Sequence, residues 1–351
     1  MKDIHNYSLL AHNTFGIDAK CKRFVEYASV EEAQQIAAGL TDADQPLLIL
    51  GGGSNLLLTG DYPATVLHSA IHGIDVLDNE RLAEAEHDES LRNPDLVFLR
   101  CGSGEVFDDV VAYAVRHGYH GAENLSIIPG EVGASAVQNI GAYGVEAKDI
   151  IYKVETVEIA TGKVVVFDNA ACQYSYRQSK FKHEWKNQYL VTHVVYRLIK
   201  AFVPDLDYGN IRTSLAAKGI EHPTAQQLRD VIIEIRNAKL PDPKVQGNAG
   251  SFFMNPIVEK TKYEELAAQY PEMPHYTVDA SHEKIPAGWM IERCGWKGKS
   301  LGHAGVHDKQ ALVLVNRGGA TGEDIVRLCE AIQHDVKAKF GIEIHPEVNI
   351  K

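Results

Sequence analysis

Three glycine-bearing segments carry the residues whose types and spacing suit ligand chemistry. The first, residues 51–55 (Gly-Gly-Gly-Ser-Asn), separates two apolar runs, Pro46 to Leu50 and Leu56 to Leu58. It lacks the Lys-Ser/Thr ending of a P-loop, and an apolar strand follows where a Rossmann fingerprint requires a helix. Successive glycine N–H groups can still bind an anion, with side-chain donors from Ser54 and Asn55. The alternative is a tight turn.

The second segment, residues 127–144, mixes small residues with polar amides and has no clear periodicity. Small residues allow the backbone to approach a flat ligand closely, and Gln138, Asn139 and Tyr143 offer hydrogen-bonding edges and an aromatic face. Two such segments in one chain favour a nucleotide-type cofactor more than either does alone.

The third segment, residues 247–256, contains Ser251. The G-x-S-x-G elbow of hydrolases is absent, because Phe253 stands where the second glycine should be. Ser251 could instead donate a proton from a tight turn, and a simple turn residue is the alternative.

Two charged residues outside these segments are further candidates. Arg177 lies in the polar and aromatic stretch 174–179, where a guanidinium could clamp a carboxylate. A surface arginine stacked on tyrosine is the alternative. Glu347 follows Pro346 in a predicted strand, which indicates a sheet edge or a bulge, where side chains can be directed toward a site. The alternative is an edge carboxylate.

Composition limits the other classes of function. The formal net charge of −12 gives no basic surface for nucleic acid. His303 and His307 have the i, i+4 spacing of helical zinc ligands, but no helix is predicted there and the glutamate of an H-E-x-x-H motif is absent. We therefore predict no metal site. The first ten residues lack a signal-peptide core, and no apolar run approaches the roughly 18 residues that span a bilayer. Five widely spaced cysteines without a C-x-x-C pair fit reduced thiols, so we expect a cytoplasmic protein without a membrane partner.

The elements that must position these residues follow from capping and periodicity. Capping-box patterns at Ser29 and Thr224 predict helices after them. The charged stretch from Asn79 to Pro94 predicts a solvated loop or irregular hairpin, and the prolines at 241 and 243 predict a junction. The remaining predicted helices cover 106–116 and 321–340. The predicted strands cover 46–50, 56–58, 97–101, 153–159, 163–167, 189–198 and 342–350.

Taken in order along the chain, these segments resemble the UDP-N-acetylenolpyruvoylglucosamine reductases, flavoenzymes that make UDP-N-acetylmuramate. The resemblance rests on Asn13 to Gly16, Leu50 to Asn55, Ile128 to Gly130, Gln138 to Gly144, Tyr176 to Ser179, Lys239 to Pro243, Gly247 to Pro256, Ala287 to Trp289 and Pro346 to Val348.

The resemblance implies an α+β fold, with a two-lobed FAD-binding domain of the vanillyl-alcohol-oxidase (PCMH) type and a smaller α+β substrate-binding domain. The expected boundaries are 1–205 for the FAD-binding domain, with lobes of about 1–67 and 68–205. Residues 206–330 would form the substrate-binding domain, and residues 331–351 a C-terminal segment that returns to the active site. We expect a monomer whose small-molecule partners are a UDP-sugar and NADPH.

The resemblance also implies the chemistry. NADPH reduces FAD and leaves, and a hydride from the flavin then adds to C3 of the enolpyruvyl group, leaving enolate-like charge on C2 and the carboxylate. Arg177 and Glu347 match the residues that hold and polarise this carboxylate, and Glu347 would need to be protonated to help an anion. Ser251 matches the proton donor to C2.

The remaining expected contacts also come from the resemblance. Position 134 is alanine here, whereas relatives can carry serine. This removes one possible hydroxyl donor to the flavin and leaves backbone N–H groups and Ser135 as donors. Tyr276 looks like the lid tyrosine of the longer family type. The expected FAD contacts are Leu50, Gly51, Gly52, Gly53, Ser54, Asn55, Ile128, Pro129, Gly130, Ala134, Ser135, Val137, Asn139, Ile140, Gly141, Ala142 and Tyr143. The expected substrate contacts are Tyr143, Tyr208, Lys239, Asn255 and Tyr276.

Two other classes compete with this interpretation. A related flavin oxidase acting on a small alcohol would keep the FAD segments but need neither Ser251 nor Glu347. A non-catalytic UDP-sugar binder would have lost its flavin.

Overall fold

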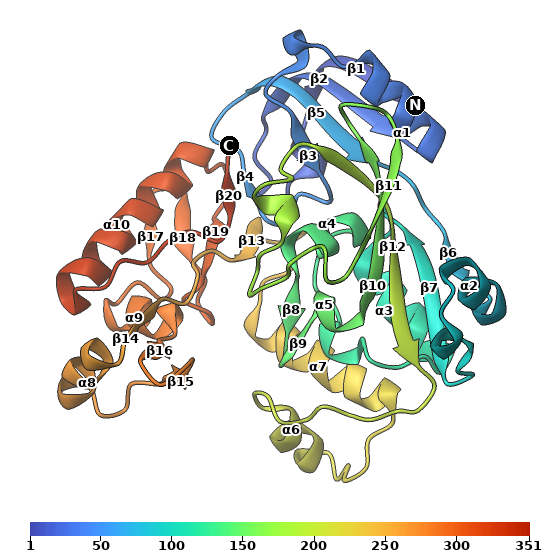
Figure 1. Ribbon diagram of the computed structural model, residues 1–351. Helices are drawn as coiled ribbons and strands as arrows, with labels where there is room; N and C mark the ends of the chain where they lie inside the picture. The colour runs from blue at the N-terminus through green and yellow to red at the C-terminus, as the bar shows by residue number, and fades with distance from the viewer. The chain divides into compact units, whose positions relative to one another are not determined.

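The structure is a computed structural model that describes residues 1–351, and its contacts divide the chain into two compact units (Figure 1). Unit 1 comprises Met1–Tyr7, Cys21–Gly52 and Pro63–Ala238. Unit 2 comprises Ser8–Lys20, Gly53–Tyr62 and Lys239–Lys351. The predicted division after residue 205 differs from this one, because residues 206–238 cluster with unit 1. The junction instead lies just before the proline pair at 241 and 243.

The first sheet of unit 1 has the order β1-β2-β5-β3, with β3 parallel to β5. Its strands are β1 (Lys2–Ser8), β2 (Lys20–Tyr27), β3 (Leu48–Leu50) and β5 (Tyr62–Ser69). Helix α1 (Val30–Gly39) begins as predicted, because Ser29 accepts a hydrogen bond from the N–H of Glu32. Its face of Ala33 and Ile36 packs into a core shared with β2 and β5.

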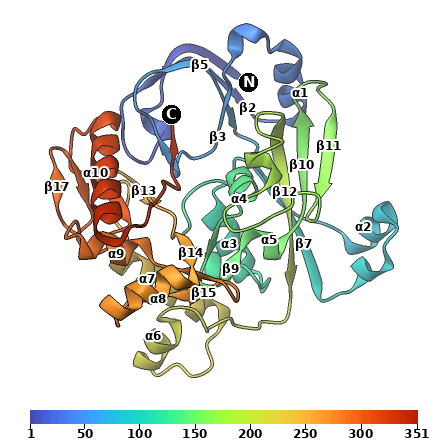
Figure 2. The ribbon, with the colours of Figure 1, turned by 60° about the vertical axis from the view of Figure 1, so that its left-hand side comes forward.

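The second sheet of unit 1 is antiparallel, with the order β11-β10-β12-β7-β6. Its strands are β6 (Ile74–Val76), β7 (Leu96–Gly102), β10 (Ile151–Glu158), β11 (Val164–Asp168) and β12 (Tyr189–Ile199). Helix α1 packs near one end of β10 (Figure 2). The predicted hairpin of residues 153–167 is confirmed, since β10 pairs with β11.

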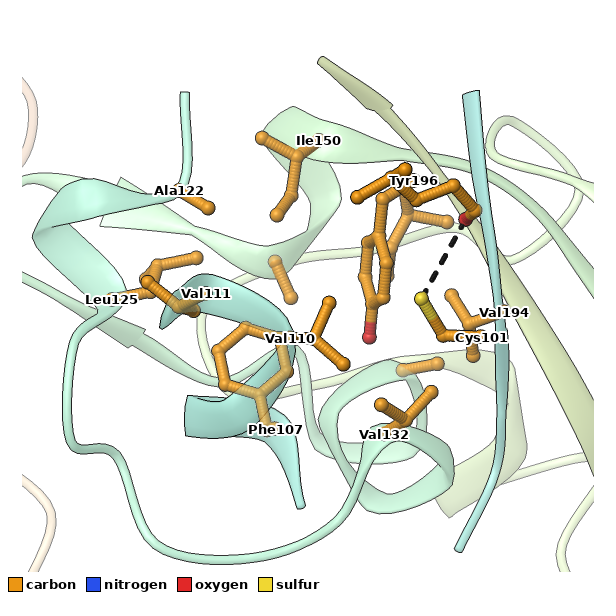
Figure 3. Packing of buried hydrophobic residues seen from close by; sticks show 14 of the residues in the cluster. Cys101, Phe107, Val110, Val111, Ala122, Leu125, Val132, Ile150, Val194 and Tyr196 are labelled. Atoms are coloured by element: carbon orange, nitrogen blue, oxygen red, sulfur yellow. Dashed lines mark hydrogen bonds between the residues drawn. The ribbon is translucent and has the colours of Figure 1, made fainter. Parts of the chain in front are cut away.

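Three helices cover this sheet: α3 (Phe107–Arg116), α4 (Val132–Gln138) and α5 (Ala147–Ile150). Figure 3 shows Phe107 and Val110 of α3 beside the ring of Tyr196 on β12. The Tyr196 hydroxyl lies 2.7 Å from the Ser135 hydroxyl on α4, so this buried phenol has a polar partner. The dashed line in Figure 3 is the weak bond from the buried Cys101 thiol to the Leu99 carbonyl, 3.8 Å long.

The prediction of a loop from Asn79 to Pro94 is wrong, because α2 (Asn79–Glu86) and a 3-10 helix, η3 (Glu89–Arg92), occupy it. Asp78 caps α2 by accepting from the N–H of Arg81, 3.1 Å away. Leu82 and Leu91 are buried with Phe98 of β7, while the charged residues face solvent. Two or three apolar anchors are therefore enough to hold a short, highly charged helix.

Unit 1 ends with α6 (Ile211–Ala217) and α7 (Ala225–Lys239). The Thr224 capping box is present, because Thr224 and Gln227 exchange two hydrogen bonds. Apolar residues of α6 and α7 form one small core. Arg229 of α7 makes a bidentate pair with Asp108 of α3, at 2.7 and 2.8 Å, and Asp108 also accepts from the N–H of Ile127.

Unit 2 contains a sheet of order β13-β19-β18-β17, a sheet of order β14-β16-β15 and a parallel pair of β4 with β20. The strands are β4 (Leu56–Leu57), β13 (Asn248–Ser251), β14 (Ile257–Glu259), β15 (Tyr276–Thr277), β16 (His282–Lys284), β17 (Ser300–Leu301), β18 (Ala304–Val306), β19 (Val313–Asn316) and β20 (Asn349–Ile350). The helices are α8 (Lys260–Gln269), α9 (Ala287–Arg293) and α10 (Gly322–Phe340).

Helix α10 has the predicted ends, with a Thr321 capping box and Gly341 in the left-handed conformation after its last turn. The predicted strand 342–350 is wrong for most of its length, since only Asn349–Ile350 forms a strand. Pro346 cannot donate to a ladder, and the residues before β20 make individual hydrogen bonds instead.

The remaining short elements are β8 (Gly141–Ala142) paired with β9 (Val145–Glu146) and four 3-10 helices, η1 (Leu10–His12), η2 (Asp42–Asp44), η4 (Glu123–Leu125) and η5 (Lys180–Lys182). No helix of the protein combines the length and apolar character needed to cross a bilayer.

Candidate functional site

The first glycines of the 51–55 loop pack against the second segment inside unit 1. A Cβ added at Gly51 would lie 3.1 Å from the Ala134 Cβ, and one at Gly52 would lie 3.5 Å from the Gly130 Cα. The side chain of Glu131 is the other neighbour of both glycines. The two segments predicted to bind one cofactor are thus adjacent. A side chain at Gly51 would crowd Ala134, whereas one at Gly52 would make only ordinary van der Waals contacts.

The rest of the glycine loop belongs to unit 2. Gly53 has φ +63°, and a Cβ there would lie 1.9 Å from the His12 carbonyl oxygen. The Gly53 carbonyl accepts from the N–H of Thr14, and the Asn55 side-chain amide donates to the Glu347 carbonyl, 3.3 Å away. Gly53 is therefore required by sterics as well as by backbone conformation.

We predict that Gly53→Ala lowers the free energy of unfolding by about 3 kcal/mol or more, because left-handed strain adds to overlap with a carbonyl. Gly60→Ala is the matched control, since a Cβ at Gly60 meets nothing within 4 Å and its φ is not positive. It should change stability by less than about 0.5 kcal/mol. Urea denaturation of both variants checks this, and equal stability of the two would contradict it.

Arg177 is tied to the end of the second segment. Its guanidinium donates to the Gly141 carbonyl at 2.6 Å and to the Asn139 carbonyl at 3.3 Å. It also lies 5.0 Å from the Tyr176 ring centre, so the stacking considered from the sequence is present as well. Arg177 itself has φ +57°, a strained conformation of the kind found at functional sites.

Neighbouring hydrogen bonds hold the two stretches together. The Ser179 hydroxyl donates to the Val137 carbonyl at 2.6 Å, and the Asn139 amide donates to the Ser175 carbonyl at 2.8 Å. The guanidinium of Arg177 is consequently held against the backbone of residues 139–141, which the sequence assigned to the cofactor.

Tyr143 and Tyr208, two predicted substrate contacts, lie together in unit 1. Their rings meet edge to face with centroids 6.4 Å apart, and a Cβ at Gly209 would touch the Tyr143 ring at 3.6 Å. Burial raises the pKa of the Tyr143 phenol, which is hydrogen-bonded to Arg236 of α7.

Arg236 is a residue that the sequence analysis missed. Burial lowers the pKa of its guanidinium, and its Nε is buried without a hydrogen-bond partner. A buried donor of this kind needs an acceptor, so Arg236 is a candidate ligand-binding residue. Its spacing was the available signal, because it precedes Lys239 by three residues and so shares a face of α7.

In unit 2 the Ser251 and Glu347 segments are joined by the backbone. The Glu347 N–H donates to the Phe252 carbonyl at 2.8 Å, and the Met254 N–H donates to the His345 carbonyl at 3.0 Å. Ser251 is exposed at the end of β13, directly after Gly250 with φ +70°. Glu347 is half-buried and lies outside β20, so the prediction that it lies in a strand is wrong, although Pro346 does form an isolated bridge with Phe253.

The other predicted substrate contacts have distinct settings. The Asn255 side-chain oxygen accepts from the N–H of Ala287 at 2.9 Å, which ties the third segment to the start of α9. Tyr276 is exposed on β15 with the Lys284 ammonium 5.6 Å from its ring, and Lys239 is exposed at the end of α7.

The comparison with known families places this geometry in a class. An FAD binding domain profile matches residues 21–168, which include Gly51, Gly52 and the 127–144 segment. Gly51 and Gly52 fit such a ligand, because neither carries a side chain that could cover its backbone N–H group. The protein is therefore a flavoprotein.

A second profile, the C-terminal domain of UDP-N-acetylenolpyruvoylglucosamine reductase, matches residues 242–351. The reductase of that name from Bacteroides fragilis is 55% identical over 345 residues, covering 98% of both chains. The one from Flavobacterium johnsoniae is 42% identical over 346 residues, again covering 98% of both. The chain belongs to the UDP-N-acetylenolpyruvoylglucosamine reductase family.

Solved structures agree on the fold. The UDP-N-acetylenolpyruvylglucosamine reductase of Thermus caldophilus matches with a TM-score of 0.66 at 20% identity, covering 99% of this chain and 98% of that one. The 6-hydroxy-D-nicotine oxidase of Arthrobacter nicotinovorans matches with a TM-score of 0.53 at 13% identity, covering 97% and 86%. The predicted α+β fold, with an FAD-binding domain of the vanillyl-alcohol-oxidase type, is confirmed.

The predictions of family, enzyme class and flavin cofactor are also confirmed. This chain is an FAD-dependent oxidoreductase that reduces UDP-N-acetylenolpyruvoylglucosamine in peptidoglycan precursor synthesis.

Proposed function

We propose that NADPH is the reductant of this enzyme and that Arg177, Ser251 and Glu347 act on the enolpyruvyl group. When bound, FAD supplies the hydride that adds to C3 of that group. The chain must then stabilise negative charge on C2 and the carboxylate and deliver one proton to C2. The observation that carries the proposal is the 2.8 Å bond from the Glu347 N–H to the Phe252 carbonyl, because it joins an acid segment to a proton-donor segment.

Arg177 binds the substrate carboxylate in this proposal. A guanidinium offers several donors in a fixed plane, which suits a carboxylate that gains charge. Its bonds to the carbonyls of Asn139 and Gly141 support this role, since they restrict its rotamer before any substrate arrives.

Ser251 delivers the proton to C2, and Glu347, in its protonated form, donates a hydrogen bond to the developing anion. A serine hydroxyl is a weak acid, but an enolate-like carbon is a strong base. The exposure of Ser251 after a left-handed glycine supports the role, because the hydroxyl is accessible to a ligand.

The other residues of the proposed site bind either FAD or the UDP-sugar. FAD is held mainly by backbone groups, with Ser54 and Asn55 as side-chain donors, whereas the Ser135 hydroxyl donates to the Val132 carbonyl, 2.7 Å away. The residues that contact FAD are Leu50, Gly51, Gly52, Gly53, Ser54, Asn55, Ile128, Pro129, Gly130, Ala134, Ser135, Val137, Asn139, Ile140, Gly141, Ala142 and Tyr143. Tyr143, Tyr208, Lys239 and Asn255 bind the UDP-sugar, with Lys239 at the diphosphate, and Tyr276 belongs to a lid.

We further propose that residues up to about 205 form the FAD-binding domain, that residues 206–330 bind the substrate and that residues 331–351 complete the site. The enzyme acts as a monomer in the cytoplasm, a setting supported by its five free cysteines.

Anaerobic titration of the purified holoenzyme tests the reductant and the substrate in one cuvette. NADPH should bleach the flavin absorbance, and UDP-N-acetylenolpyruvoylglucosamine should then restore it in stoichiometric amount. NADH is the control for the reductant, and we expect it to bleach the flavin at least about 10-fold more slowly. Equal rates with NADH, or no bleaching by NADPH, would contradict the proposal.

A further inference from the structure

We propose that Asp108 and Arg229 are positioning residues, which hold the turn of residues 127–130 in the shape that contacts FAD. The inference rests on the proposed function, which assigns residues 128–130 to the flavin. Neither charged residue is among the proposed ligand contacts, so both act on FAD through the backbone of the turn.

The turn has a backbone conformation that its own residues do not favour. Ile127 has φ +49° and Gly130 has φ +118°. Glycine adopts such angles without cost, but a β-branched residue in the left-handed region is strained. Pro129, between them, has no N–H group to donate. The turn therefore needs contacts from other parts of the chain to keep its shape.

The start of α3 supplies these contacts at both ends of the turn. The Phe107 N–H donates to the Gly130 carbonyl at 3.0 Å, and the Ile127 N–H donates to the Asp108 carboxylate at 2.6 Å. The first bond joins two backbone groups, whereas the second depends on the identity of one side chain. The strained end of the turn is therefore held by Asp108.

Arg229 of α7 fixes this carboxylate in place. Its two terminal nitrogens donate to the two oxygens of Asp108, at 2.7 and 2.8 Å, so the carboxylate cannot rotate without breaking both bonds. Only 7% of the Arg229 surface is exposed. A buried charge that loses its partner is strongly unfavourable, so the two side chains act as one unit.

The pair gives α7 a role in holding the cofactor. The FAD binding domain profile ends at residue 168, well before the start of α7 at Ala225. Arg229 nevertheless reaches the turn that precedes α4, and Arg236, seven residues further along the same helix face, is hydrogen-bonded to the Tyr143 phenol. Helix α7 thus supports two of the proposed flavin contacts from outside the matched domain.

The test is the dissociation constant of FAD, measured on the full-length holoenzyme from the flavin fluorescence that dilution releases. Asp108→Ala should raise this constant on the order of 10-fold to 100-fold, because the turn is no longer preorganised. Asp108→Asn keeps an acceptor for the Ile127 N–H and should raise it less. Arg229→Met should also weaken binding, and Arg229→Lys should recover part of the loss, since it restores the charge but not the planar fork.

Asp109→Ala is the matched control. Asp109 is the next residue in the same first turn of α3, and it is exposed. Its removal deletes the same carboxylate from the start of the helix, and the dissociation constant of FAD should match that of the wild type.

Urea denaturation of each variant separates a structural role from a positioning role. If Asp108→Ala lowered stability but bound FAD as tightly as Asp109→Ala, the pair would only support the fold and the inference would be wrong. Should Asp108→Ala fail to fold, Asp108→Asn and Arg229→Lys decide the question, and wild-type affinity in both would overturn the inference.

Hydrogen exchange separates failure of this inference from failure of the proposed function. In the wild type, bound FAD should slow amide exchange in a peptide that covers residues 125–134. Absence of this protection would overturn the proposed FAD position and the inference together. Protection in the wild type, with unchanged FAD affinity in the Asp108 and Arg229 variants, would overturn the inference alone.

Discussion

Replacing Ser251 with alanine should slow reoxidation of the flavin by the enolpyruvyl substrate on the order of 10³-fold, with reduction by NADPH almost unchanged. Only the second half-reaction needs a proton at C2. Loss of the hydroxyl should therefore slow that half-reaction and leave the first one unchanged. Ser251 is exposed at the end of β13, and its side chain fills no core, so the fold should tolerate the change. Anaerobic stopped-flow spectroscopy measures each half separately.

Ser300→Ala provides the matched control for this experiment. Ser300 is an exposed serine on β17, an edge strand of the same sheet as β13. Both half-reactions of this variant should match the wild type. If Ser251→Ala slowed the two halves equally, the serine would have a role in holding the flavin or the fold, and the assigned proton transfer would be wrong.

Replacing Arg177 with alanine should lower the rate of substrate reduction on the order of 10²-fold to 10³-fold, because charge that develops on the substrate carboxylate loses its guanidinium partner. The same change removes the bonds to the Asn139 and Gly141 carbonyls, so FAD affinity must be measured alongside the rate. Arg177→Lys separates the contribution of the positive charge from the contribution of the planar guanidinium geometry. It keeps the positive charge but not the planar fork, and should recover only part of the rate.

Arg212→Ala controls for the loss of a surface charge in the same unit. Arg212 is exposed and pairs only with the exposed Asp207. Its removal should leave both half-reactions unchanged. Stopped-flow rates of Arg177→Ala equal to those of Arg212→Ala would remove Arg177 from the reaction.

Elements with local signals were predictable from the sequence. Helices α1, α7 and α10 start at capping residues, and α10 stops at a glycine, because those hydrogen bonds join residues three or four positions apart. Helix α2 and the 3-10 helix η3 were missed because their buried residues, Leu82 and Leu91, pack against Phe98 on another element. Helix α4 was hidden in the 127–144 segment for a similar reason, since its small residues carry no apolar period.

The candidate site, too, was only partly predictable from the sequence. By residue type and order, the sequence alone identified the glycine loop, the 127–144 segment, Ser251, Arg177 and Glu347, and through the family resemblance it identified the flavin and the substrate. Residue type and order suffice for this, because a ligand's chemistry selects particular donors and acceptors.

Only the tertiary structure decided which groups face each other across long sequence separations. His68 meets Glu131 across 63 residues, and Arg177 meets Gly141 across 36. The Phe252 carbonyl meets the Glu347 N–H only because β13 and the chain before β20 are brought together in unit 2. Such contacts depend on how sheets and helices pack, and packing energy is summed over many residues, so no local pattern in the chain encodes it.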